Sequence, residues 1–90
     1  MTSKERAGFR SMANTMQPIF QIGKNGISEN TIRQVDDALE ARELIKITVL
    51  ETAGEETKTL AHDLAKEVNA EVIQVIGSKF VLYRKSKKNK

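Results

Sequence analysis

The 90-residue sequence contains no cysteine and no tryptophan, a single proline, three phenylalanines and one tyrosine. Without cysteine, the chain cannot form disulfides or thiolate metal sites. No apolar stretch approaches the ~18 residues of a membrane span, and the N-terminus lacks the apolar core of a secretory signal. The lack of cysteine also fits a reducing compartment. We therefore expect a cytoplasmic protein without a membrane segment.

Residues that support catalysis are equally scarce. His62 is the only histidine, and its neighbours place it on a helix rather than beside a nucleophile. Asp36, Asp37 and Glu40 could bind a metal, but a cluster of this kind is usually a solvated helix face. The sequence has no Walker motif and no dinucleotide fingerprint. We expect no enzymatic activity, no metal and no cofactor.

The charges are distributed unevenly although the net charge is only +3. The segment RKSKKNK at the C-terminus is strongly basic, whereas most acidic residues lie between Glu29 and Glu71. Basic ends suggest a polyanionic partner, but a basic tail also serves as a solubilising segment. We predict one domain over residues 1–84, followed by a basic disordered tail at 85–90.

Hydrophobic periodicity predicts seven elements in the order αβαβαββ. Ser3 and Ser28 are the expected N-caps of the first two helices, and Asn69 the expected end of the third. Two strand–helix–strand units followed by a hairpin predict an α/β sandwich, a mixed four-stranded sheet with packed helices. The predicted elements are helix 4–14, strand 19–22, helix 28–42, strand 44–50, a helix after the turn at 51–57, strand 71–76 and strand 79–84.

The stretch IGKNGISEN, between the first strand and the second helix, combines two glycines with a cation. Gly23 and Gly26 permit positive φ and close approach of another backbone. Lys24 supplies a charge, and Asn25 supplies hydrogen bonds. The N-terminus of the following helix favours anions, as in GXXG loops that clamp nucleotides. Many strand–helix turns contain two glycines for geometry alone, and Glu29 in the first helical turn opposes an anion site.

Several separated motifs strengthen the RNA-binding interpretation. PIFQIGKNGISENTIRQVDDALEARELIKITVL, followed by AEVIQVIGSKFVLYR, resembles the CRM domain in its stand-alone bacterial form, the YhbY-like family. The resemblance extends from about Lys4 to Arg84. It implies an RNA-binding α/β fold similar to the C-terminal domain of bacterial translation initiation factor three. It also implies association with precursors of the large ribosomal subunit, and therefore a role in ribosome biogenesis.

The hypothesis that follows is an RNA-binding protein that contacts the RNA backbone and assists ribosome assembly. The expected contacts are Gly23, Lys24, Asn25 and Gly26 in the loop, with Lys4, Arg10 and Arg84 extending a basic patch. Because aromatics are few, we expect backbone contacts rather than a stacking platform. The expected partner is ribosomal RNA or a pre-ribosomal large subunit, with no membrane and no small-molecule cofactor. The alternative is a protein-interaction adaptor that docks a partner on the acidic helix 28–42.

Overall fold

The computed structural model describes residues 2–86 and confirms the predicted order of elements, with boundaries that move by about one residue. The prediction of an α/β fold with a mixed four-stranded sheet and three helices is also confirmed. The elements are α1 (Ser3–Ala13), β1 (Phe20–Ile22), α2 (Glu29–Arg42), β2 (Leu44–Val49), the short 3₁₀ helix η1 (Glu51–Ala53), α3 (Thr57–Val68), β3 (Glu71–Ile76) and β4 (Lys79–Tyr83).

Two helix starts illustrate how local side chains set these boundaries. The predicted cap of α1 at Ser3 is wrong, because Thr2 caps this helix in a reciprocal capping box. The Glu5 N–H donates to Thr2 Oγ1 at 3.1 Å, and the Thr2 N–H donates to Glu5 Oε1 at 2.9 Å. The hydrogen bond from the Thr2 backbone lowers the pKa of Glu5. The predicted cap of α2 is confirmed, since Ser28 Oγ accepts the Thr31 N–H at 3.2 Å.

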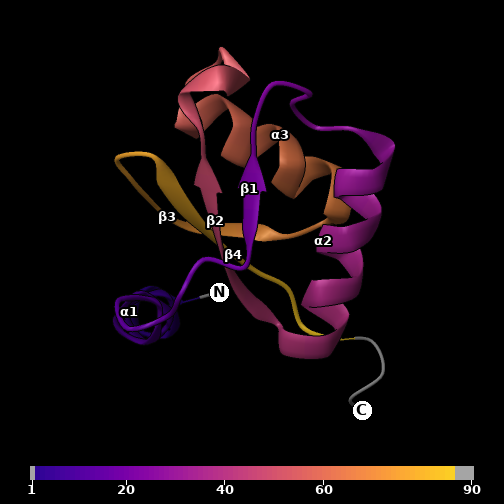
Figure 1. The fold of residues 1–90 in the computed structure, drawn as a ribbon. Helices are drawn as coiled ribbons and strands as arrows, with labels where there is room; N and C mark the ends of the chain where they lie inside the picture. Colours follow the sequence, from indigo (N-terminus) through magenta and orange to yellow (C-terminus); the bar gives the residue numbers. More distant parts are fainter. Residues whose placement is uncertain (1, 87–90) are drawn as a thin grey trace.

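The sheet has the strand order β1-β2-β4-β3. β1 and β2 are parallel and are joined through α2, whereas β4 lies antiparallel between β2 and β3. Figure 1 shows β1 and β2 pointing in the same direction, with the chain turning away into α2 beyond β1. The ends of β1 and β2 and the turn between β3 and β4 therefore lie at the same end of the sheet.

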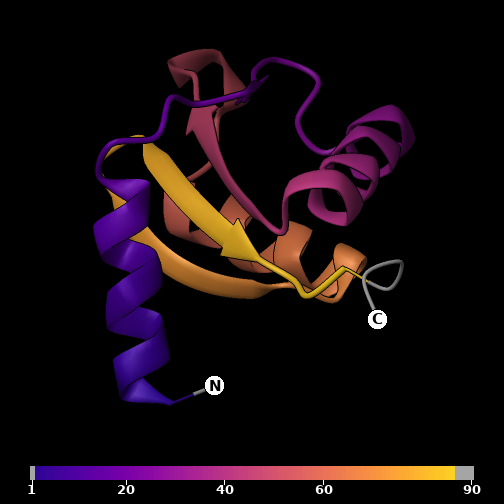
Figure 2. The ribbon, with the colours of Figure 1, turned by 90° about the horizontal axis from the view of Figure 1, so that it is seen from below.

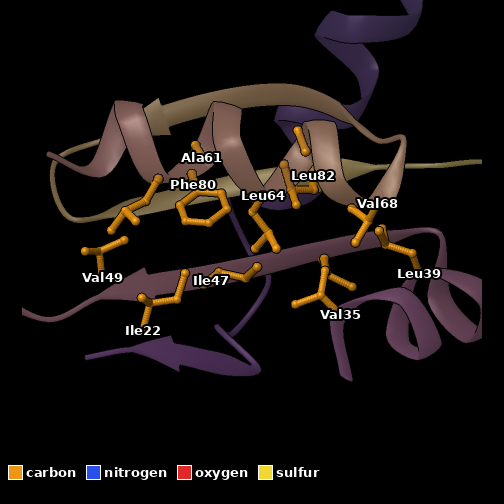
Figure 3. Close-up of a cluster of buried hydrophobic side chains, with 13 residues drawn as sticks. Ile22, Val35, Leu39, Ile47, Val49, Ala61, Leu64, Val68, Phe80 and Leu82 are labelled. Carbon is orange, nitrogen blue, oxygen red and sulfur yellow. The ribbon is translucent and has the colours of Figure 1, made fainter. Parts of the chain in front are cut away.

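The helices cover the two faces of the sheet unequally (Figure 2). α2 and α3 pack on one face over the main core, to which Ile22, Ile47 and Phe80 contribute from the strands (Figure 3). α1 packs on the opposite face over a smaller cluster that includes Ala13 and Val81. One helix is narrower than the sheet that it covers, so part of this second face is open.

Hydrogen bonds from two cationic side chains fix α1 to the sheet. The Arg6 guanidinium donates to the Val72 carbonyl at 2.6 Å. The Lys46 ammonium donates to the carbonyl of Ala13, the last residue of α1, at 3.2 Å and to that of Met16, just beyond the helix, at 3.4 Å. These two charges are engaged within the fold. Among residues 2–86, no helix has the length and apolar character that crossing a membrane requires.

Candidate nucleic-acid interface

Three segments meet at one end of the sheet: residues 23–26, 50–56 and 77–79. We call them together the loop edge. The Leu50 N–H donates to the Ile22 carbonyl at 2.8 Å, and the Val49 N–H donates to the Ser78 carbonyl at 2.6 Å. The end of β2 thus holds the segment after β1 on one side and the β3–β4 turn on the other.

The GKNG segment forms a tight turn whose tip faces solvent. The Gly26 N–H donates to the Gly23 carbonyl at 2.9 Å, and Gly26 adopts a φ of +60°. This φ is strained for a residue with a Cβ, so glycine is the residue that the turn requires. Lys24 and Asn25 at the tip are exposed, and no residue among 2–86 accepts a hydrogen bond from their backbone N–H groups. The tip therefore presents two free donors and one cation.

The structure gives a packing reason for glycine at position 23, while the predicted contact of Gly23 with RNA stays a prediction. The φ of Gly23 lies outside the left-handed region. A Cβ built on Gly23 would lie 3.3 Å from Thr52 Oγ1 and 3.4 Å from Leu50 Cδ1. The absence of a side chain at Gly23 is thus explained by packing against the 50–56 segment inside the protein. Of the two glycines, only Gly26 has open space around its α-carbon.

The helix α2 does not begin directly after the turn, because Ile27 and Ser28 intervene. Ile27 packs on the main core and anchors the turn to the body of the domain. Ser28 satisfies one of the free N–H groups of the helix start, and Glu29 places a carboxylate in its first turn. The positive pole of α2 is thus partly neutralised before any ligand arrives.

The charges on the loop edge are mixed. Lys24 and Lys79 lie on it, but so do Glu51, Glu55 and Glu56, and all five residues are exposed. Three carboxylates against two ammonium groups leave no broad positive field at this edge. A polyanion must therefore be held by local contacts at the lysines rather than by a long-range electrostatic attraction.

Lys79 was not among the contacts expected from the sequence, although it lies at the loop edge. In the fold it lies opposite Thr48 of β2, at the end of the sheet to which the GKNG turn belongs. Insertion of β4 between β2 and β3 produces this proximity, and the strand order was not predictable from the chain. No described residue forms an ion pair with Lys79.

The structure contradicts the prediction that Arg84 extends the basic patch. Arg84 follows β4 at the opposite end of the sheet from the loop edge, and its side chain is only 10% exposed. Its guanidinium donates to Asp36 Oδ1 at 2.5 Å and Glu40 Oε1 at 3.0 Å. It also donates to the carbonyls of Val68 at 2.8 Å and Asp36 at 3.1 Å. A charge engaged in this way joins β4, α2 and α3 and is not available to RNA.

The same cluster revises the expected arrangement of charges on α2. Asp36 was expected on a solvated helix face, but its carboxylate forms an ion pair with Arg84. Glu40 was expected on an exposed face, yet its side chain is only 16% exposed. The adaptor hypothesis therefore loses two of the carboxylates on which a docked partner would depend, leaving Asp37 as an exposed acid in the middle of α2.

Lys4 and Arg10 are exposed on α1, and neither forms an ion pair with any of residues 2–86. They do not lie at the loop edge. Arg6, between them, bonds to Val72 near the start of β3. The turn at Gly77 lies beyond the other end of this strand, which at 3.3 Å per residue is about 17 Å away. A contact that joins Lys4 to the GKNG turn must therefore span one face of the domain, whereas Arg10 lies one helical turn before Asn14, which borders the β3–β4 turn.

Tyr83, His62 and the possible metal ligands are the other side chains that could have served a functional site. The Tyr83 ring stacks on Phe9 with centroids 4.2 Å apart, beneath α1, so it is not a free stacking platform. Burial, with smaller effects of Glu43 and Glu5, raises the pKa of Tyr83. His62 is exposed on α3. No group of three or more potential metal-ligating side chains occurs within residues 2–86.

The predicted tail at 85–90 lies partly outside the described residues. Within them, Ser86 is buried, and its N–H donates to Glu43 Oε2 at 2.7 Å. Ser86 Oγ donates to Glu40 Oε2 at 3.2 Å. The packed structure therefore extends two residues past the predicted boundary at 84, while residues 87–90 are outside the described part of the chain.

Comparison with known proteins gives a consistent picture. The sequence model of the CRS1 / YhbY (CRM) domain matches residues 1–84. The chain is 44% identical over 90 residues to YqeI of Bacillus subtilis, named a probable RNA-binding protein, and the match covers 100% of this chain and 94% of YqeI. It is 29% identical over 90 residues to an RNA-binding protein of Haemophilus influenzae, covering 100% of this chain and 91% of that protein.

A solved structure supports the same relationship. The fold matches the solution structure of a hypothetical Staphylococcus aureus protein, for which RNA binding is suggested, with a TM-score of 0.77 and 48% sequence identity. This match covers 100% of the present chain and 94% of the other. The two relatives and the solved structure match 100% of the chain, and the family model matches residues 1–84.

Proposed function

Because the chain belongs to the CRS1 / YhbY (CRM) domain family, we propose that it binds ribosomal RNA or precursors of the large ribosomal subunit and assists ribosome assembly in the cytoplasm. The relatives described above are named as RNA-binding proteins. The proposed action is binding and chaperoning of RNA, with no chemical turnover. The polar face of the domain that meets the RNA includes the GKNG turn.

One observation carries the assignment of the contact to this turn. Lys24 and Asn25 form a solvent-exposed tip with two unpaired backbone N–H groups, held by the hydrogen bond between Gly26 and Gly23. Backbone N–H groups beside a cation suit a phosphate, because they donate without the entropy cost of ordering a side chain. Lys24 neutralises the phosphate, Asn25 bonds to phosphate or sugar, and Gly26 maintains the turn.

The free cations determine how binding depends on salt. Lys4, Arg10, Lys24 and Lys79 have no ion-pair partner among the described residues, whereas Arg84 is engaged. If these four each meet one phosphate of a single-stranded RNA, the slope of log K against log salt is about −2.8. The carboxylates of the 50–56 segment keep the affinity modest, since they repel the same phosphates.

A charge reversal in the turn tests the site directly. Lys24→Glu should weaken binding to a ribosomal RNA fragment by tenfold or more at low salt, with a thermal midpoint close to that of the parent. Lys66→Glu on α3 is the matched control, because it makes the same charge change at an exposed position outside the loop edge. Equal binding by Lys24→Glu and the parent would exclude the turn as the contact.

The opposite perturbation provides a second test. Glu51→Gln and Glu55→Gln remove repulsion next to the turn and should strengthen RNA binding by about two- to fivefold, most clearly at low salt. The control is Asp37→Asn, which removes an exposed carboxylate in the middle of α2, away from the loop edge. Strengthening by the control and the loop-edge variants alike would mean that net charge alone, and no local site, governs affinity.

Sedimentation of a cell lysate through a sucrose gradient tests the biological role. The proposal expects the protein to migrate with immature large subunits, and the Lys24→Glu variant to shift toward the top of the gradient. A parent protein that stays at the top, although it binds ribosomal RNA in vitro, would retain the RNA-binding function and reject the role in assembly.

A further inference from the structure

The face of the sheet that α1 covers only in part contains a groove of about 360 Å³ next to the β3–β4 turn. Figure 1 shows this turn, between β3 and β4, at its left. Ile76 and Val81 provide its apolar walls, and Asn14, Gln74 and Lys79 line it with polar groups. Val81 belongs to the cluster under α1, which places the groove on the same face as that helix. Ile76 is 61% exposed, an unusual state for an isoleucine in a strand.

The strand register connects this groove to the GKNG turn. Gln21 of β1 lies opposite Thr48 of β2, Thr48 lies opposite Lys79 of β4, and Lys79 lies opposite Ile76 of β3. Residues that are directly opposite share one face of a sheet, so these four form a row across all four strands. Three strand spacings make the row about 14 Å long. It begins two residues before Gly23.

The other side of the loop edge is unfavourable for RNA. Between α2 and α3 lies a groove of about 670 Å³ that is lined by Glu55, Asp63 and Glu67, with Lys66 as its cation. Three carboxylates repel phosphates there. A strand held at Lys24 therefore has a lower electrostatic cost when it leaves over the open sheet face, where Lys79 is the charged residue of the row.

We propose that a single-stranded segment of the bound RNA crosses this row and places one unpaired base in the groove against Ile76. The inference rests on the proposed function and deepens it, since it assigns the ligand as RNA with an unpaired nucleotide next to its anchored phosphate. Lys79 holds the phosphate of that nucleotide. The Asn14 and Gln74 amides bond to the edge of the base.

The chemistry of the lining supports a base as occupant. An amide has one acceptor and two donor hydrogens, which match the alternating donors and acceptors on base edges. No described residue forms a hydrogen bond with the side-chain amide of Asn14 or Gln74. Ile76 offers an aliphatic surface for one side of the ring. The residues that line the groove include no aromatic side chain, so the groove does not provide strong stacking. It discriminates unpaired from paired RNA because its amides bond to base edges that pairing would occupy.

The test measures how tightly the 90-residue chain binds each of two RNAs. The first is a fully paired hairpin, and the second is the same stem with a short unpaired 3′ strand that contains 2-aminopurine. The parent should bind the second RNA about five- to tenfold more tightly, and its 2-aminopurine fluorescence should change on binding. Ile76→Ser should remove most of that preference. Val75→Ser is the matched control, because Val75 is the neighbouring β-branched residue and pairs with Phe80 on the other face.

The outcomes separate this inference from the proposed function. Equal affinity of the parent for both RNAs, with binding still sensitive to Lys24→Glu, would overturn the groove assignment and keep the turn. Absence of RNA binding by the parent would overturn both. A second measurement needs no variant: on addition of the unpaired RNA, the NMR signals of the Asn14 and Gln74 side-chain amides should shift, and unchanged signals would refute the inference.

Discussion

Arg84 offers the sharpest test of how the structure uses its charges. The substitution Arg84→Ala removes four hydrogen bonds that the guanidinium donates to α2 and to the end of α3. It also removes the ion pair between Arg84 and Glu40, whose side chain is only 16% exposed. Loss of one partner of a buried ion pair costs about 3–5 kcal/mol. The half-exposed Asp36 is resolvated in the variant, so we expect the lower value, about 3 kcal/mol.

That loss is large for a domain of this size. Small domains are stable by about 5–15 kcal/mol, and 1 kcal/mol shifts the melting temperature by about 4–8 °C. Arg84→Ala should therefore melt about 12–24 °C below the parent when unfolding is followed by circular dichroism. Lys85→Ala is the matched control, because Lys85 is the exposed neighbour and has no ion-pair partner among the described residues. It should melt within about 2–4 °C of the parent.

RNA binding distinguishes the structural role from the one predicted by sequence. At a temperature at which both proteins are folded, Arg84→Ala should bind ribosomal RNA as tightly as the parent and with the same salt slope. A variant that melts like the parent would refute the ion-pair argument. If it also bound RNA several-fold more weakly, Arg84 would return to the RNA-binding surface.

Three further predictions follow from individual residues. Gly26→Ala should lower the free energy of unfolding, measured by denaturant titration, by about 1 kcal/mol, because the φ of Gly26 is +60°. Gly26→Asn should lower it by less, since asparagine tolerates this φ better. Equal losses in the two variants would contradict this explanation. Because the folded-state pKa of Tyr83 is raised, its contribution to stability is complete below the unfolded value of about 10 and is lost as pH rises through the folded value. Thermal melts should thus show a melting temperature that falls as pH rises above about 10, and Tyr83→Phe should reduce this fall. If the parent and Tyr83→Phe showed the same dependence of melting temperature on pH, Tyr83 would be excluded as its source. Thr2→Ala removes the cap of α1 and should cost about 1 kcal/mol, whereas an unchanged denaturation midpoint would show that the capping box does not stabilise the fold.

Much of the architecture could be predicted from local pattern. The alternation in LIKITVL marks β2, the spacing of Leu60, Leu64 and Val68 marks α3, and Asn69 ends that helix with a φ of +55°. These signals are local, since a strand or helix repeats its buried face over a few residues. The same reasoning identified Ser28 as a cap but chose Ser3 over Thr2, because only the reciprocal bond with Glu5 distinguishes two adjacent candidates.

The roles of the cations could not be predicted in this way. Lys46 and Arg84 are basic residues in the sequence, yet the fold directs them to backbone carbonyls and to carboxylates far away along the chain. Lys79 was not among the predicted contacts, yet it lies at the loop edge. A side chain is available for RNA only if no partner in the fold engages its charge, and that partner is set by strand order and helix docking.

The sequence by itself determined the family, the order of helices and strands, and the need for glycine at the left-handed residue of the GKNG turn, because each follows from short-range pattern or backbone sterics. Tertiary structure alone decided that Gly23 makes room for Thr52, that Arg84 joins β4 to α2, and that the β3–β4 turn lies beside the end of β2. These features depend on contacts between residues distant in sequence, whose partners are chosen by the packing of the whole chain.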